Sequence, residues 1–184
     1  MTSIIIKTVL AAGLLAAIPA ARAETTVKVG ITPAGQPASG LDRVTRAPEG
    51  FAVEIMQAIG SDAGLRIQFE AMPFGELQQA LVDRKIDAIA GSFGITPERQ
   101  KVVDFTHPYG RYQDILVVKA ADTKSYASVG DLKGRTIATS RGSSFVKPLE
   151  EAGATLSPFA TPPESIAALA AGPVDGIVDN GLQL

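Results

Sequence analysis

The segment 86–99, with the sequence IDAIAGSFGITPER, contains the residues whose chemistry is most specific. Its apolar first half predicts a buried strand. Thr96 followed by Pro97 predicts a helix start, because threonine caps helix N-termini and proline suits the first helical position. Arg99 would then lie in the first turn, where the positive end of the helix dipole disfavours a cation. An anion held between the loop amides and the guanidinium would reverse that penalty, so the pattern predicts a carboxylate-binding site.

Alternating strands and helices must position this segment. Successive strands joined by helices predict an α/β fold with parallel sheets and right-handed crossovers. Such sheets bind ligands at the carboxyl ends of their strands, where the loop at 91–94 lies. The expected strands are 27–31, 67–71, 88–90, 114–119, 136–139, 154–159 and one beginning at 176, and the expected helices include 51–59, 74–82, a short turn at 131–134, 145–151 and 163–171.

The first 23 residues have the pattern of a secretory signal peptide. Lys7 precedes an apolar run at 8–20, and the residues at 21–23 form an A-x-A cleavage signal. The run is short for a membrane span, so an N-terminal anchor is the less favoured alternative. The chain has no cysteine, which excludes disulfides, a thiol nucleophile and a cysteine-ligated metal site. Export without disulfides favours a periplasmic location.

Composition and motifs argue against several functional classes. The formal net charge is −2 and basic runs are absent, which argues against binding to nucleic acid. His107 is the only histidine and has no cysteine near it, so we expect neither a metal nor any other cofactor. No Ser-His-Asp order, P-loop or H-E-x-x-H motif indicates an enzyme.

Four segments together resemble the bacterial extracellular solute-binding proteins of family 3, the polar amino-acid receptors of ABC importers. They occur in the family's order and at its spacing, and the joint match is specific although each segment alone would be weak. The segments are 49–55, 85–99, 101–109, and 131–134 followed by Gly142 and Ser143.

The resemblance implies a fold like that of type II periplasmic-binding proteins, with two lobes, mostly parallel sheets and a hinge that closes around a ligand. It implies a first lobe at 24–117 and a second at 118–184, with the polar stretch 120–125 as a boundary candidate. Family members continue beyond the position of Leu184, complete the second lobe and cross back to the first. We therefore expect both lobes to be incomplete, either in a fragment or in a shortened gene product.

By similarity, Arg99 would bind the α-carboxylate of the ligand in a two-pronged bond. Ser92, Gly94 and the amides of their loop would complete the carboxylate site. Ser143 and Ser144 would reach the same carboxylate from the second lobe.

The resemblance also implies which residues contact the ammonium and the side chain of the ligand. Phe74 is at the position where the family has an aromatic ring over the ligand. An acid near the end of the second lobe binds the ligand ammonium in the family, and the match here falls on Asp179 or Asn180. We favour Asp179 because a carboxylate can pair with a cation.

Several positions depart from the family pattern. Thr32, a further candidate ligand residue, stands where many relatives have an acid. Gly35, Pro37 and Ala38 stand where relatives often have an aromatic residue and a Pro-Phe pair, and Gly94 replaces an expected hydroxyl residue. The carboxylate half is therefore better preserved than the ammonium and side-chain half. We expect an amino acid or a related small carboxylate as ligand.

Each of these assignments has an ordinary structural alternative. Arg99 could be a solvated helix arginine, and Phe74 could belong to the core. Ser143 and Ser144 could cap a helix, a role that is compatible with ligand binding. Asp179 could be a plain loop acid.

The resemblance favours a periplasmic substrate-binding component, not an enzyme. Its partners would be a small-molecule ligand and the permease of an ABC transporter in the inner membrane, and it would be a monomer if full length. The alternative is a secreted enzyme on the same fold, similar to the cyclohexadienyl and arogenate dehydratases. Such an enzyme needs a general acid or base, for which Glu49, Glu98, His107 and Asp179 are the candidates.

Overall fold

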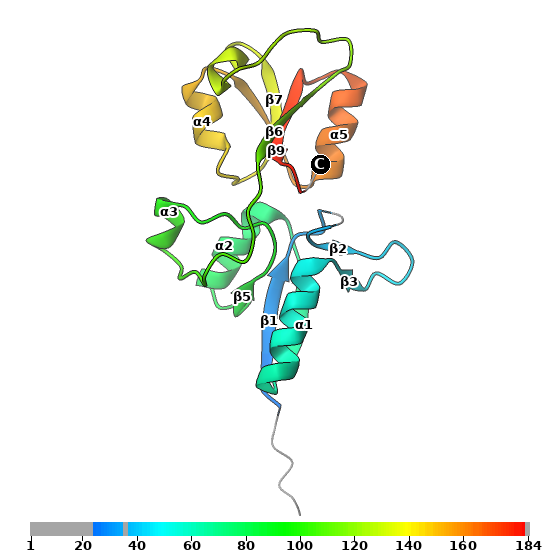
Figure 1. Ribbon diagram of the computed structural model, residues 1–184, viewed down its shortest axis with the longest axis vertical. Helices are drawn as coiled ribbons and strands as arrows, with labels where there is room; N and C mark the ends of the chain where they lie inside the picture. The colour runs from blue at the N-terminus through cyan, green and yellow to red at the C-terminus, as the bar shows by residue number, and fades with distance from the viewer. Residues whose placement is uncertain (1–23, 35–36, 183–184) are drawn as a thin grey trace, which may run out of the picture.

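The computed structural model describes residues 24–34 and 37–182. Figure 1 shows two α/β lobes joined by an extended segment, with the first lobe below and the second above. The expected signal peptide at 1–23 and the departure at Gly35 lie outside the described residues. No helix within the described ranges is long and apolar enough to cross a membrane.

A three-stranded parallel sheet in the order β4-β1-β5 organises the first lobe. Val29 and Ile31 of β1 pack against Val53 of α1. Side chains alternate along a strand, so Gly30 faces the opposite side, toward Leu77 of α2. The elements of this lobe are β1 Thr26–Ile31, β2 Gly40–Leu41, β3 Pro48–Glu49, α1 Phe51–Ala63, β4 Arg66–Ala71, α2 Phe74–Val82, β5 Ala88–Ile89 and α3 Pro97–Gln100.

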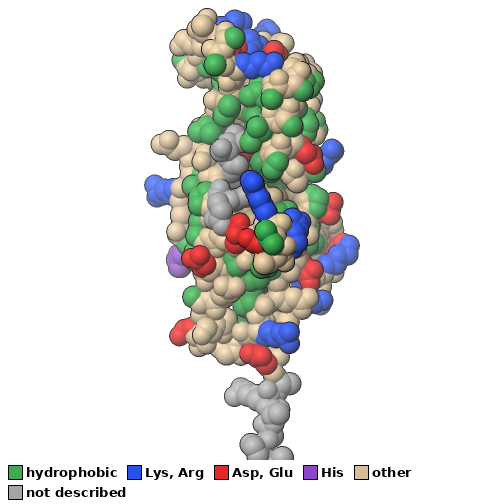
Figure 2. All heavy atoms as spheres, turned by 90° about the vertical axis from the view of Figure 1, so that its right-hand side faces the viewer, with side chains coloured by type: hydrophobic (Ala, Val, Ile, Leu, Met, Phe, Trp, Pro, Cys, Tyr) green, Lys and Arg blue, Asp and Glu red, His purple; other side chains and the backbone are tan. Residues whose placement is uncertain are grey.

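The hairpin of β2 and β3 is a feature that the sequence did not predict. Each strand has two residues, too few to show an alternating pattern. Figure 2 looks onto this side of the molecule and shows acidic and basic side chains interspersed there. Asp42, Arg43 and Arg46 come from the loop that joins the two strands. This face therefore has no large patch of a single charge.

A four-stranded sheet in the order β6-β9-β7-β8 organises the second lobe. Ile137 of β7 packs with Leu149 of α4, and its neighbour Ala138 packs with Leu169 of α5, so the two helices cover opposite faces of the sheet. The elements are β6 Asp114–Val118, η1 Val129–Leu132, β7 Thr136–Ser140, α4 Val146–Glu151, β8 Thr155–Phe159, α5 Pro162–Ala171 and β9 Gly176–Asn180.

The sheet pairing corrects the expected division between the lobes. The expected boundary between 117 and 118 falls inside the expected strand at 114–119, but the observed strand β6 pairs along its whole length with β9 in the second sheet. It runs antiparallel to β9, whereas the other strands of this sheet pair in parallel. The polar stretch 120–125 consequently lies inside the second lobe, where Asp122 forms an ion pair with Arg135. The second lobe therefore begins before residue 118.

Candidate ligand-binding site

A narrow cavity lies between the two lobes, at the carboxyl ends of strands from both sheets. The loop after β5 and the start of α3 form one face, and the ends of β7 and β9 form the other. Six of the predicted site residues meet here. The lining residues are Phe74, Ser92, Arg99, Tyr112, Ser140, Ser143, Ser144, Phe145, Asp179 and Asn180.

Arg99 projects into this cavity from a helix of only four residues. The predicted N-cap is confirmed, because the Arg99 amide donates to Thr96 Oγ1 at 3.2 Å and Pro97 opens α3. The Arg99 residue is only 8% exposed. Nη1 donates to the Gly94 carbonyl at 2.8 Å, and Nη2 donates to the Gly142 carbonyl of the second lobe at 3.1 Å. The alternative of a solvated helix arginine is therefore wrong.

The Arg99 guanidinium lacks an acidic partner among the described residues. Burial lowers the pKa of Arg99, because desolvation disfavours its charged form. Arginine nevertheless keeps its proton in proteins, so the cavity contains a desolvated positive charge. An anionic ligand would supply the missing partner.

The Arg99 guanidinium lies over two aromatic rings. Its central carbon lies 4.0 Å from the ring centroid of Phe93 and 5.4 Å from that of Phe74. Phe74 also packs with the α2 core cluster, so it belongs both to the core and to the cavity lining. Phe93 was not predicted, because its ring reaches Arg99 only through the turn of the 91–96 loop. Such contacts orient an arginine side chain and add a cation–π attraction.

Asp179 faces the cavity from the second lobe. It is 2% exposed on β9. Ser140 Oγ donates to Oδ2 at 2.7 Å, and the Asn180 amide donates to Oδ1 at 2.8 Å. Burial raises the pKa of Asp179, while these two hydrogen bonds act in the opposite direction. Asp179 is therefore a buried strand residue, and the loop-acid alternative is wrong.

The two serines after β7 are arranged differently from a helix cap. The N-cap of α4 is Phe145, and no side chain caps it. Ser143 Oγ instead lies 3.1 Å from Thr139 Oγ1. Both Ser143 and Ser144 line the cavity, so the capping alternative is not what the structure shows.

The lobes touch backbone to backbone beside the cavity. Gly142 has φ of 74°, a left-handed conformation that favours glycine, and a Cβ built on it would lie 3.1 Å from the Cα of Gly75. A Cβ built on Gly75 would lie 2.9 Å from the Arg141 carbonyl oxygen. This contact brings the Gly142 carbonyl within reach of Arg99.

Comparison with known proteins identifies the group to which this architecture belongs. Residues 27–158 match the profile of the bacterial extracellular solute-binding proteins, family 3. The chain belongs to this family. The family and the two-lobed α/β fold expected from the sequence are thereby confirmed.

Individual relatives support this membership. The chain is 31% identical over 171 residues to the L-arginine-binding protein of Pseudomonas aeruginosa, covering 91% of this chain and 65% of that protein. It is 35% identical over 101 residues to the probable amino-acid-binding protein YxeM of Bacillus subtilis, covering 55% and 38%. Matches to the first curated relatives span about two-fifths of their length, between 38% and 41%.

Solved structures of binding proteins have the same fold. An ancestral arginine-binding protein bound to glutamine gives a TM-score of 0.80 at 29% identity, over 88% of this chain and 72% of that chain. A second neighbour is the ancestral amino acid-binding protein AncCDT-1, described as a precursor of cyclohexadienyl dehydratase. It gives a TM-score of 0.77 at 26% identity, over 84% and 70%.

Two other predicted residues of this family member have different surroundings. Gly94 contributes its carbonyl to Arg99 but is not part of the cavity lining. Thr32 is buried beside the end of β1, and its carbonyl accepts a hydrogen bond from Ser39 Oγ at 2.8 Å. The hydroxyls of Thr32 and Ser92 are both buried without a partner among the described residues. Only Ser92 lines the cavity, so the structure does not bring Thr32 into the site.

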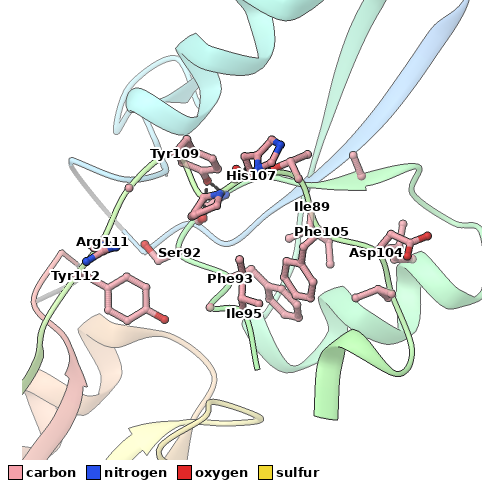
Figure 3. Close-up of a pocket in the computed structure, with 18 of the residues that line it drawn as sticks. Ile89, Ser92, Phe93, Ile95, Asp104, Phe105, His107, Tyr109, Arg111 and Tyr112 are labelled. Carbon is pink, nitrogen blue, oxygen red and sulfur yellow. Dashed lines mark hydrogen bonds between the residues drawn. The ribbon is translucent and has the colours of Figure 1, made fainter. Parts of the chain in front are cut away.

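A larger hollow of about 520 Å³ lies mainly along the first lobe. Figure 3 shows its aromatic side chains, among them Phe93, Phe105 and Tyr109. Tyr109 Oη donates to the Gly91 carbonyl at 2.7 Å and so fixes the start of the 91–96 loop. Neither Arg99 nor Asp179 lines this hollow, so its size does not make it the better site for a charged ligand. The narrow cavity contains both the buried Arg99 and the buried Asp179.

Proposed function

We propose that this chain is the substrate-binding component of an ABC importer and captures an amino acid between its lobes. The single observation that carries this proposal is the buried Arg99, which has no acidic partner among the described residues and lines the same cavity as the buried Asp179. A zwitterion presents a carboxylate to the cation and an ammonium to the carboxylate. Both buried charges would then be compensated, which favours binding over leaving either one unpaired.

The carboxylate of the ligand would bind on the Arg99 side. The planar guanidinium matches a carboxylate in a bidentate geometry. The unpaired hydroxyl of Ser92 and the hydroxyls of Ser143 and Ser144 line the cavity as further donors. Gly94 takes part through its carbonyl, which fixes Nη1.

The ammonium would bind to Asp179. The carboxylate oxygens already accept hydrogen bonds from Ser140 and the Asn180 amide, which hold the group in one orientation. Asn180 also lines the cavity, but its Oδ1 accepts a hydrogen bond from the Leu182 amide at 3.1 Å. A neutral amide cannot compensate an ammonium charge, so Asp179 is the better partner.

The names of relatives suggest which amino acids to test first. Proteins from Bacillus subtilis, Escherichia coli and Pseudomonas aeruginosa that match this chain are named for arginine binding. One structural neighbour is an arginine-binding protein that holds glutamine. L-arginine and L-glutamine are therefore the first candidates for this chain.

Location and partner complete the proposal. Residues 1–23 would direct export to the periplasm, and the closed form of the two lobes would dock on a permease in the inner membrane. A binding role is favoured over a dehydratase role by the cavity itself. Of the four candidate acids and bases, only Asp179 lines it, whereas Glu49, Glu98 and His107 do not.

Calorimetry with the purified chain tests the proposed function. L-arginine, L-glutamine and the other common L-amino acids are titrated in turn. The amide of the amino acid that binds lacks the carboxylate charge, and the N-acetyl derivative lacks the ammonium. Both derivatives should bind far more weakly than the parent. Equal binding of the parent and its amide would contradict the assignment to Arg99, and no saturable heat with any amino acid would contradict the function.

A further inference from the structure

The space above Gly94 is occupied by the side chain of Tyr112. A Cβ built on Gly94 would lie 2.3 Å from the Tyr112 hydroxyl oxygen and 3.8 Å from Arg99 Nη1. The phenol hydroxyl therefore lies where a side chain at position 94 would project, beside the guanidinium. Tyr112 also lines the narrow cavity. The sequence did not predict it, because the segment at 110–113 matches no motif.

The ring and the hydroxyl of Tyr112 contact different lobes. The ring packs with the second-lobe cluster that contains Leu132 and Phe145. The hydroxyl reaches the first-lobe loop at Gly94, and Figure 3 shows Tyr112 on the linking segment with its hydroxyl turned toward the side of Phe93. Burial raises the pKa of Tyr112, so the phenol keeps its proton and remains a hydrogen-bond donor at neutral pH.

We infer that Tyr112 is a ligand-binding residue, whose hydroxyl donates to the carboxylate held by Arg99 and limits the size of the cavity above Gly94. This inference rests on the proposed function. A glycine at position 94 leaves room for the phenol, and a larger residue there would collide with it. The two positions should therefore behave as a pair, in which the hydroxyl can come from one residue or from the other.

Four variants test this pairing by calorimetry with L-arginine and L-glutamine. Tyr112→Phe should weaken binding by about ten- to hundredfold, because one hydrogen bond to a charged group is lost. Gly94→Ala should weaken binding more than Tyr112→Phe but less than Arg99→Ala, since its methyl group would overlap the hydroxyl oxygen. Gly94→Ala combined with Tyr112→Phe should bind better than Gly94→Ala alone, because the nearest ring carbon lies 3.5 Å from the added Cβ. Gly94→Ser combined with Tyr112→Phe should recover part of the lost affinity, since it returns a hydroxyl.

Controls separate a binding role from a structural one. Tyr126→Phe is the matched control, because Tyr126 donates to Asp122 at 2.8 Å in the second lobe and does not line the cavity. Melting temperatures of the ligand-free variants identify any general loss of structure.

The outcomes distinguish this inference from the proposed function. If the unchanged chain binds none of the common L-amino acids, the proposed function and this inference are both overturned. If Arg99→Ala loses binding while Tyr112→Phe binds as well as the unchanged chain, the inference alone is overturned. Gly94→Ala can be made in the unchanged chain and in the Tyr112→Phe variant. An equal rise in Kd in both backgrounds would also overturn the inference.

Discussion

The two faces of the cavity hold opposite charges by different means. On the first-lobe face, Arg99 extends from a four-residue helix, and its two terminal nitrogens already donate to the carbonyls of Gly94 and Gly142. On the second-lobe face, Asp179 lies within a strand and accepts hydrogen bonds from Ser140 and from the next amide. A bidentate carboxylate would have to take over or share the donors of Arg99, whereas an ammonium can approach an acceptor that is already oriented.

We expect the two faces to determine different properties of the site, namely its affinity and its response to pH. The first-lobe face should determine most of the affinity, because its charge has no acidic partner among the described residues until an anion arrives. The second-lobe face should determine the response to pH, because burial raises the pKa of Asp179. The following predictions, from the largest expected effect to the smallest, test this division.

Arg99→Ala should cause the largest loss. Removing a buried charged partner of a ligand costs about 2–5 kcal/mol, which is roughly a thirtyfold to several-thousandfold rise in Kd. Arg99→Lys should restore only part of the affinity, because lysine lacks the planar fork. Calorimetry measures both, with Arg66→Ala on the exposed end of β4 as the control. An unchanged Kd in Arg99→Ala would show that the first-lobe face does not determine the affinity.

Asp179→Asn should cost less, by about ten- to hundredfold in Kd. The asparagine keeps the size and can accept one of the two hydrogen bonds from Ser140 and the Asn180 amide, but it loses the charge that pairs with the ammonium. In the absence of ligand this variant should melt close to the unchanged chain at neutral pH, since the removal of a buried charge offsets the loss of one accepted hydrogen bond. Calorimetry and thermal melting measure the two effects. A large loss of ligand-free stability would instead show that Asp179 serves the fold.

The pH dependence of ligand binding should come from Asp179 on the second-lobe face. The pKa of Asp179 is raised, so the folded chain takes up a proton at a higher pH than the unfolded chain does. Lowering the pH from neutral through this raised pKa should therefore stabilise the ligand-free protein and weaken amino-acid binding, because the proton competes with the ammonium. Arg99 stays charged over the same range. Asp179→Asn should remove the slope of Kd with pH, and a slope of Kd that persists would point to another group. The melting temperature of the variant should lose only the contribution of Asp179, because the lowered pKa values of Asp42, Asp83, Asp122 and Asp131 act in the opposite direction.

Gly142→Ala should have the smallest effect, a severalfold loss of affinity. The added Cβ would meet Gly75 at 3.1 Å and hold the lobes slightly apart. Gly134→Ala is a matched control, because Gly134 has φ of 75° while a Cβ there meets no atom within 4 Å. Both variants share the backbone strain of about 1–2 kcal/mol. Calorimetry should therefore show a greater loss of affinity for Gly142→Ala, and equal losses would exclude a steric role for this contact.

Local patterns predicted the parts of the site that local physics determines. Thr96, Pro97 and Arg99 followed from capping rules, and α2 begins and ends at the predicted residues because its apolar spacing is regular. Their neighbours along the chain specify these features. The predicted strands and helices are accordingly close to those observed.

The remainder depends on contacts between distant segments. Tyr112 meets Gly94, and Gly75 meets Gly142, only after both lobes have formed. The assignment of β6 to the second sheet likewise depends on pairing with β9, which is far along the chain. Residue types alone give no signal for such pairs. Thr32 is buried at the end of β1 and does not line the narrow cavity, so its role in binding stays a prediction.

The contact between Gly75 and Gly142 also has an evolutionary consequence. Neither residue has a side chain, so the gap between the lobes at this edge is determined by the main chain alone. Every single amino-acid replacement at either position adds bulk, and none can make the gap narrower. Descendants of this protein could change their preference for a ligand through Phe74, Tyr112 or the serines, while this edge would stay fixed. The main-chain contact would thus preserve the spacing of the lobes, while the side chains beside it change.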